Sequence, residues 1–146
     1  MPTAAKLFGL ILYFGIGWLA AGFVVDTFPE GMVLTWFPLT IALIGAWQGW
    51  MVAGGNAGKG IGMAFANGIR ASVQLAFFGL LLFSLYTMFQ RAARLRYDGA
   101  GEAVIATLEL FLEYFLQSLT VPIWGILLVG GAIAGLIVET VSRIWR

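Results

Sequence analysis

The stretch from residue 7 to residue 25 reads LFGLILYFGIGWLAAGFVV and contains no charged residue. A helix of this length rises about 28 Å, which matches a bilayer hydrocarbon core roughly 30 Å thick. Three further stretches are also free of charge, namely residues 36–53, 71–90 and 121–138. The chain is therefore predicted to be an all-α membrane protein.

The composition leads to the same class independently. Of the 146 residues, 61% are hydrophobic and 10% are charged, whereas about 25% are charged in soluble proteins. The net charge of +1 gives no electrostatic reason to expect nucleic-acid binding. The chain has no Cys and no His, so disulfides, thiol redox chemistry and the usual zinc sites are not expected. We expect a single integral-membrane domain, residues 1–146, with no cofactor and no metal.

We predict four transmembrane helices in a bundle, with one amphipathic helix between the third and fourth spans. The first span, 7–25, is longer than the core of a secretory signal, so we expect it to be an uncleaved anchor. The second span, 36–53, is bracketed by Trp36, Trp47 and Trp50. Tryptophans are enriched at membrane interfaces, which supports these limits.

The third span has two possible placements. An apolar helical pattern begins near Ile61 and continues to Phe89, but it includes Arg70. One helix from 61 to 96 would be about 54 Å long, more than a bilayer needs. Alternatively the span covers 71–90, with Arg70 at its edge. We favour the second placement, because an arginine at the bilayer centre costs at least ~2.5 kcal/mol whereas one near a helix end can reach the headgroups.

The last part of the chain is predicted to hold an amphipathic helix, about 101–119, followed by a span at 121–141. Glu102, Glu109 and Glu113 fall within a wedge of about 40° on the first of these helices. Such a helix should lie in the membrane interface or pack against the bundle. A five-span alternative, in which this helix also crosses, is costlier because it places carboxylates near mid-membrane.

Positive charge in short loops predicts the orientation. Four spans place five basic residues on one side: Lys6, Lys59, Arg70, Arg143 and Arg146. Three lie on the other side: Arg91, Arg94 and Arg96. This count favours cytoplasmic termini, whereas five spans would favour an external N-terminus.

Glycine spacing predicts helix packing. The segment 54–62 reads GGNAGKGIG and superficially resembles a phosphate-binding loop, but Gly follows Lys59 where that motif requires Ser or Thr. Small residues four apart instead allow another helix to approach closely. We therefore expect contacts with other membrane helices, in a homo-oligomer or a larger complex. The residues predicted to pack are Gly58, Gly62, Ala66, Gly131 and Gly135.

The charged residues offer two candidate sites. Guanidinium groups bind oxyanions, but juxtamembrane arginines more often contact lipid headgroups; the candidates are Arg70, Arg91, Arg94 and Arg96. Glu109 and Glu113, spaced i and i+4, can share a cation or act as an acid and base. Solvation of this acidic face, or pairing with arginine, is the more ordinary interpretation, and Glu102 lies close in sequence to Arg94 and Arg96.

Several short segments resemble a known family. They are Met1-Pro2-Thr3-Ala4-Ala5-Lys6, the Gly-Lys-Gly at 58–60, Arg96-Tyr97-Asp98-Gly99 followed by Glu102-Ala103, Leu128-Val129-Gly130-Gly131, and the closing Trp145-Arg146. Together they resemble the TrgA-type tellurite-resistance membrane proteins of alphaproteobacteria, nearly end to end. The resemblance implies a multi-pass protein of the bacterial inner membrane that is linked to tellurite tolerance. The resemblance does not identify any residue of this chain as part of an active site.

The residues limit how such tolerance can arise. Reduction of tellurite needs electrons from thiols or a redox cofactor, and the chain has no Cys, no His and no dinucleotide fingerprint. We therefore expect a non-enzymatic accessory or structural component of a membrane assembly. The alternative is a small oxyanion transporter or channel that uses the arginines, and a membrane-embedded enzyme using Glu109 and Glu113 ranks third.

Overall fold

The computed structural model describes residues 3–27, 35–94 and 97–145, and the described residues are almost entirely helical. The elements are α1 (Ala4–Thr27), α2 (Phe37–Gln48), a π-helical turn η1 (Gly49–Ala53), α3 (Ile61–Ala93), α4 (Ala100–Ser118), α5 (Val121–Gly125), a second π-helical turn η2 (Ile126–Gly130) and α6 (Gly131–Ile144). The π turns do not interrupt their helices, so Phe37–Ala53 and Val121–Ile144 each run as one helix.

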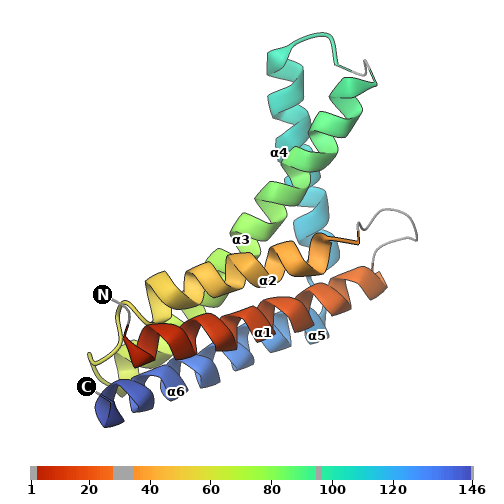
Figure 1. Cartoon of the computed structure of the whole chain (residues 1–146). Helices are drawn as coiled ribbons and strands as arrows, with labels where there is room; N and C mark the ends of the chain where they lie inside the picture. Colours follow the sequence, from red (N-terminus) through yellow and green to blue (C-terminus); the bar gives the residue numbers. More distant parts are fainter. Residues whose placement is uncertain (1–2, 28–34, 95–96, 146) are drawn as a thin grey trace.

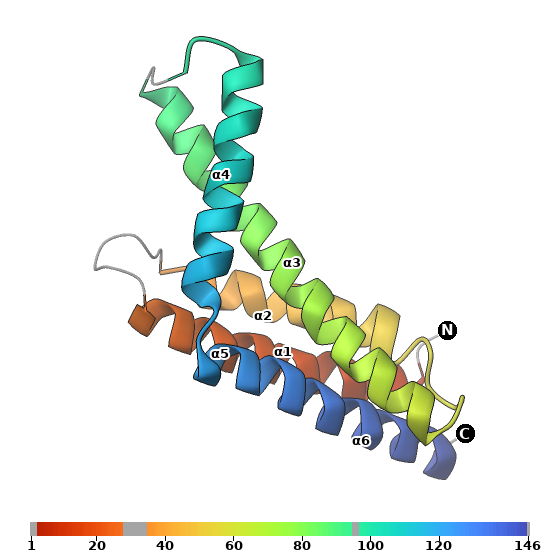
Figure 2. The ribbon, with the colours of Figure 1, turned by 180° about the vertical axis from the view of Figure 1, so that it is seen from behind.

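The helices form a body and an arm (Figures 1 and 2). The body contains α1, α2 with η1, the first half of α3, and the helix from α5 to α6. The second half of α3 leaves the body and pairs with α4 in an antiparallel hairpin, which is the arm. Because α3 is continuous, one helix belongs to both parts. The start of α1, the end of α6 and the connection from η1 to α3 lie together at one end of the body (Figure 1).

Among the described residues, three helices are long and apolar enough to cross a membrane: Ala4–Thr27, Ile61–Ala93 and Val121–Ile144. The helix Phe37–Ala53 is apolar but shorter. Each long helix leaves many large apolar side chains exposed, such as Ile11, Phe77 and Val129. A membrane protein is expected to show this pattern, since lipid covers the outer surface of its helices.

The helix that holds the predicted third span, 71–90, extends beyond it at both ends. Helix α3 begins at Ile61 and runs for 33 residues. Its first half, including Gly68 and Ser72, packs inside the body, so Arg70 lies part-way along a helix that is already in the bundle. The charge-free stretch covers the part of α3 that packs on α2, up to the contacts of Phe83 with Phe37 and of Tyr86 with Trp36, and continues into the arm.

Helices α1 and α2 approach closely because small residues face each other. A Cβ atom added at Gly9 or Gly49 would collide with the backbone of the other glycine, and one at Gly45 would collide with the carbonyl of Tyr13. At Gly17 it would lie 2.7 Å from the carbonyl oxygen of Ile41. Backbones that come this close gain extensive van der Waals contact, which drives helix association in lipid.

A second close contact joins α3 to α6. A Cβ atom at Gly68 would collide with the carbonyl of Gly131, and one at Gly135 would collide with the carbonyl of Ala64. Gly131 and Gly135 thus lie in a helix contact, as their spacing suggests. The partner ridge is not the predicted one: Gly62 and Ala66 are exposed, and nothing lies within 4 Å of a Cβ added at Gly62.

Gly58 also differs from the prediction. It lies in the connection before α3 rather than on a helical ridge, because this segment turns instead of continuing the helix. The ridge that packs inside the chain consists of Ala64, Gly68 and Ser72, and its four-residue spacing is shifted by two positions from the predicted set.

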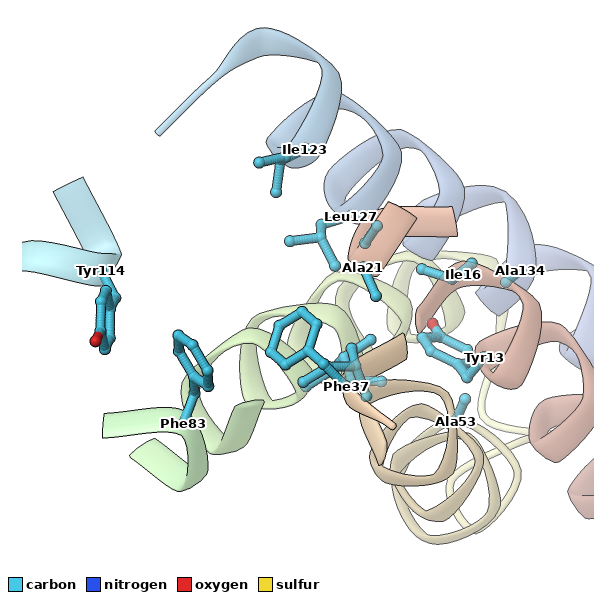
Figure 3. Packing of buried hydrophobic residues seen from close by; sticks show 14 of the residues in the cluster. Tyr13, Ile16, Ala21, Phe37, Ala53, Phe83, Tyr114, Ile123, Leu127 and Ala134 are labelled. Carbon is cyan, nitrogen blue, oxygen red and sulfur yellow. The ribbon is translucent and has the colours of Figure 1, made fainter. Parts of the chain in front are cut away.

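Aromatic side chains link the body to the arm (Figure 3). The ring of Phe83 lies 5.1 Å from that of Phe37 on α2 and 4.8 Å from that of Tyr114 on α4, measured between centroids. Tyr114 is fully buried and its hydroxyl bonds to Thr87 Oγ1 at 3.1 Å. One continuous apolar core therefore extends from the bundle into the hairpin.

Gly62 and Gly68 on α3 are expected to respond in opposite ways to substitution by alanine. Gly68→Ala should lower the free energy of unfolding by about 1–3 kcal/mol, because the added methyl group forces α3 and α6 apart. Gly62→Ala, the matched control, should raise it by up to about 1 kcal/mol, because an exposed helical glycine is replaced by a better helix former. Unfolding of the detergent-solubilised protein by SDS, followed by circular dichroism, measures both. Equal changes would contradict the assigned contact.

Candidate functional site

Tyr13 forms a polar junction inside the body. Its side chain is fully buried on α1, and its hydroxyl lies 2.8 Å from the carbonyl oxygen of Gly68 and 3.0 Å from that of Gly131. One phenol therefore bonds to the backbones of α3 and α6. Because the interior of a membrane bundle offers little water, a buried hydroxyl needs such partners.

The residues around this junction come from the middle of every helix in the body. Gly45 packs against the carbonyl of Tyr13, and Gly68 packs against Gly131. These four positions belong to α1, α2, α3 and the start of α6. They define one level of the body, which we call the Tyr13 level. At this level α1 packs closely on α2 and α3 packs closely on α6, and the Tyr13 hydroxyl joins the two pairs.

Glu139 forms a second polar site, near the end of the body where the termini lie. Its side chain on α6 is only 3% exposed. Oε2 accepts a hydrogen bond from the backbone N–H of Gly58 at 2.6 Å, and Oε1 accepts one from Gly60 at 3.1 Å. Arg143 Nε donates to Oε1 at 3.1 Å. The carboxylate thus fastens the connection before α3 to the last helix.

The shape of this connection depends on its glycines. Gly58 has φ of +89° and Gly60 has φ of +109°, a region that side chains with a Cβ rarely adopt. In this shape the two N–H groups point at one carboxylate, as in backbone nests that bind anions. The segment that superficially resembles a phosphate loop therefore binds an internal anion, the Glu139 carboxylate.

Other interactions gather at the same end. The ammonium group of Lys6 lies 5.9 Å from the ring centroid of Trp50, and the ring of Phe8 lies 5.8 Å from that of Trp145. Aromatic and basic side chains commonly mark the level where a membrane protein meets the headgroups. This end of the body has the composition of a membrane interface.

The predicted basic candidates are not brought together. Arg70 is exposed on α3, close to the Tyr13 level, whereas Arg91 and Arg94 lie at the far end of α3, in the arm. Arg96 lies outside the described residues. The separation along α3 from Arg70 to Arg91 is about 32 Å at 1.5 Å per residue, so these two arginines cannot bind one ion.

The predicted acidic face lies on α4. Glu102 Oε2 accepts a hydrogen bond from the backbone N–H of Asp98 at 2.9 Å, so it caps the start of α4. Glu109 and Glu113 are exposed on α4. In the described part of the chain, no three His, Cys, Asp or Glu residues cluster as metal ligands would.

An apolar cavity of about 60 Å³ lies where the arm leaves the body. Its walls come from α1, α2, α3 and the helix that begins with α5, and Figure 3 shows Ile123 and Leu127 facing Phe37 near it. Small residues such as Ala20 and Gly79 line it. The helices diverge at this point, and small side chains leave space between them unfilled.

Sequence reasoning did not predict the bonds of the two polar sites that the structure joins most firmly. Tyr13 is a lone phenol in the middle of an apolar span, which is a signal for a buried hydrogen bond. Glu139 precedes Arg143 by four residues, a spacing that favours an ion pair on one helix face. Its bonds to Gly58 and Gly60 span about 80 residues of sequence, so no local pattern indicates them.

Comparison of the chain with protein families, with curated proteins and with solved structures found no match. Function is therefore argued from the geometry and from the sequence resemblance.

The Glu139 site predicts a local change in protease sensitivity. Glu139→Ala removes the acceptor for Gly58 and Gly60, and hydrogen bonds to charged groups contribute about 1.5–3 kcal/mol each. Trypsin cleavage after Lys59 in the detergent-solubilised protein should therefore become at least about tenfold faster, since it follows the population of the open loop.

Two controls show whether the change in cleavage is confined to this connection. Cleavage after Arg94, in the same sample, should change little, because that residue lies in the arm. Glu109→Ala, which removes an exposed carboxylate far from the loop, should leave cleavage after Lys59 unaltered. Similar rates at Lys59 in all three proteins would show that Glu139 does not hold the connection.

Proposed function

We propose that this protein is a non-enzymatic accessory or structural component of a membrane assembly. The observation that carries the proposal is that two buried polar side chains, Tyr13 and Glu139, bond to the protein's own backbone. Tyr13 and Glu139 each bond to backbone groups of other elements, so they hold helices and a loop together. The remaining candidates for chemistry, Arg70, Glu109 and Glu113, are exposed, and Arg70 lies on a different helix from the two glutamates.

Four membrane crossings are part of the proposal, with Phe37–Ala53 as the fourth. This helix of 17 residues rises about 26 Å and lies at the short end of the range for a span. It packs along α1 from Gly9 to Gly17, so the two helices cross the same layer. Trp36 at one end and Trp47 and Trp50 near the other are placed as interfacial residues.

In this arrangement α4 is the amphipathic helix of the arm. It buries Leu110 and Tyr114 against α3 and exposes Leu108 and Leu112 beside the acidic face. An exposed apolar strip next to carboxylates suits the boundary between acyl chains and headgroups. Both termini are placed in the cytoplasm by the positive-inside rule.

The resemblance to TrgA-type proteins supplies the biological setting of the proposal: the bacterial inner membrane and tolerance of tellurite. In that setting the chain contributes packing surfaces rather than electrons. Contact with lipid is expected along its exposed apolar faces, and contact with other membrane helices where those faces carry small or charged residues.

The topology has a direct test, because the chain has no native Cys. Single substitutions Thr3→Cys, Lys59→Cys and Asp98→Cys are labelled in sealed inner-membrane vesicles with a maleimide that cannot cross the bilayer. Thr3→Cys and Lys59→Cys should react from the same side and Asp98→Cys from the opposite side. If Lys59→Cys and Thr3→Cys react from opposite sides, Phe37–Ala53 does not cross.

The accessory role is tested by purification from native membranes in mild detergent. We expect the protein to elute in a complex larger than its own 15.8 kDa plus the detergent belt, and a lone monomer would contradict the proposal. Transport is tested separately in liposomes: tellurite flux that is lost in Arg70→Ala would favour the oxyanion transporter instead. Tolerance that survives Glu109→Gln combined with Glu113→Gln would exclude the enzyme.

A further inference from the structure

Arg70 lies at half the height of the body, on its outer surface. Tyr13, the tenth residue of the 24 in α1, bonds to Gly68 and to Gly131, which is the eleventh residue of the 24-residue helix Val121–Ile144. Arg70 follows Gly68 by two residues, or about 3 Å along the helix axis. Its side chain is exposed, so it points away from the other helices of its own chain.

This position is costly for an arginine when the body spans a bilayer. The middle of a hydrocarbon core about 30 Å thick lies about 15 Å from either surface, well beyond the length of an arginine side chain. Charged residues at such depth almost always face the interior of a bundle and pair with another charge. Arg70 has no hydrogen bond or ion pair with any described residue of this chain.

The surface around Arg70 allows another helix to pack closely on α3. Gly62 and Ala66 precede it at four-residue intervals and are also exposed, so the three residues form one ridge along α3. The flanking side chains Phe65 and Phe77 are each 49% exposed. Two small residues let another helix approach α3 closely, and its approach would exclude lipid from the guanidinium.

A second copy of this chain does not supply the missing charge. Copies in one membrane are related by rotation about the membrane normal, so each residue keeps its depth. Glu113 lies next to Tyr114, which packs on Phe83, about 20 Å beyond Arg70 along α3. Asp26 lies near the end of α1, and Glu139 is buried and bonded. No described carboxylate is exposed at the depth of Arg70.

We propose that the α3 ridge of Gly62, Ala66 and Arg70 is the docking surface for a transmembrane helix of a different protein, and that this helix carries an Asp or Glu that pairs with Arg70. The inference rests on the proposed accessory function and identifies the face and the chemistry of the partner. The partner carboxylate must lie at the same depth in the membrane as Arg70. Gly62 and Ala66 allow the partner helix to pack closely on α3.

Site-specific photocrosslinking in native membranes tests the docking surface. Phe65, which flanks the ridge, is replaced by p-benzoylphenylalanine in the full-length chain, and the crosslinked peptide is identified by mass spectrometry. We expect one partner peptide that lies in an apolar segment long enough to span the membrane and that contains Asp or Glu. The same probe in place of Phe89, which is 65% exposed on the arm, should not crosslink to that peptide.

Arg70 variants test the ion pair in the same experiment. Arg70→Gln should lower the crosslink yield at least about tenfold, because it leaves the partner carboxylate unpaired. Arg70→Lys should retain most of the yield, since it keeps the charge. Arg94→Gln, the matched control at the end of α3, should leave the yield unchanged.

Four outcomes would overturn the inference: crosslinks to lipid alone, crosslinks to a second copy, a partner segment without a carboxylate, or a yield that does not respond to Arg70→Gln. Each is compatible with a larger complex in the native purification. A complex without the predicted crosslink would therefore reject this surface and leave the accessory function standing, whereas a lone monomer would reject both.

Discussion

Close contact between backbones is the constraint on which the structure depends. At the Tyr13 level, α1, α2, α3 and α6 approach each other so closely that a methyl group on Gly45, Gly68 or Gly131 would collide with a neighbouring helix. Helices in lipid gain no hydrophobic driving force from meeting, so contact area and internal hydrogen bonds must hold them. The small residues therefore determine which helices pair most closely.

The polar groups complete this packing. Tyr13 connects three helices through a single hydroxyl, and Glu139 connects α6 to the turn before α3 through two backbone N–H groups. Both side chains are buried, and both bond to backbone atoms. The bonds of Tyr13 define the register of α1 against α3 and α6, since a shift of one residue would break them, whereas those of Glu139 hold the turn before α3 against α6. The exposed charges, in contrast, have no such role inside the chain.

The sequence was sufficient for the class of the fold and for most helix limits. Charge-free stretches predict α1, Phe37–Ala53 and Val121–Ile144 to within a few residues, because lipid selects against charge along a whole span. For α3 they mark only part of the helix. Arg70 ends the charge-free stretch, whereas the helix itself continues through Arg70 to Ile61. Glycine spacing identified Gly131 and Gly135, but on α3 it marked Gly62 and Ala66, whereas the contact within the chain uses Ala64, Gly68 and Ser72. Two ridges of small residues lie on that helix, and spacing alone does not rank them. The partners of Glu139 depend on a tertiary contact across the chain, so the residue could be noticed but its bonds could not be foreseen.

Helix α3 belongs to both parts of the molecule, so the body and the arm share one continuous helical backbone. Phe83 lies where the two parts meet, and its ring packs on Phe37 of the body and on Tyr114 of the arm. A substitution at this single position would therefore disturb the packing of both parts at once.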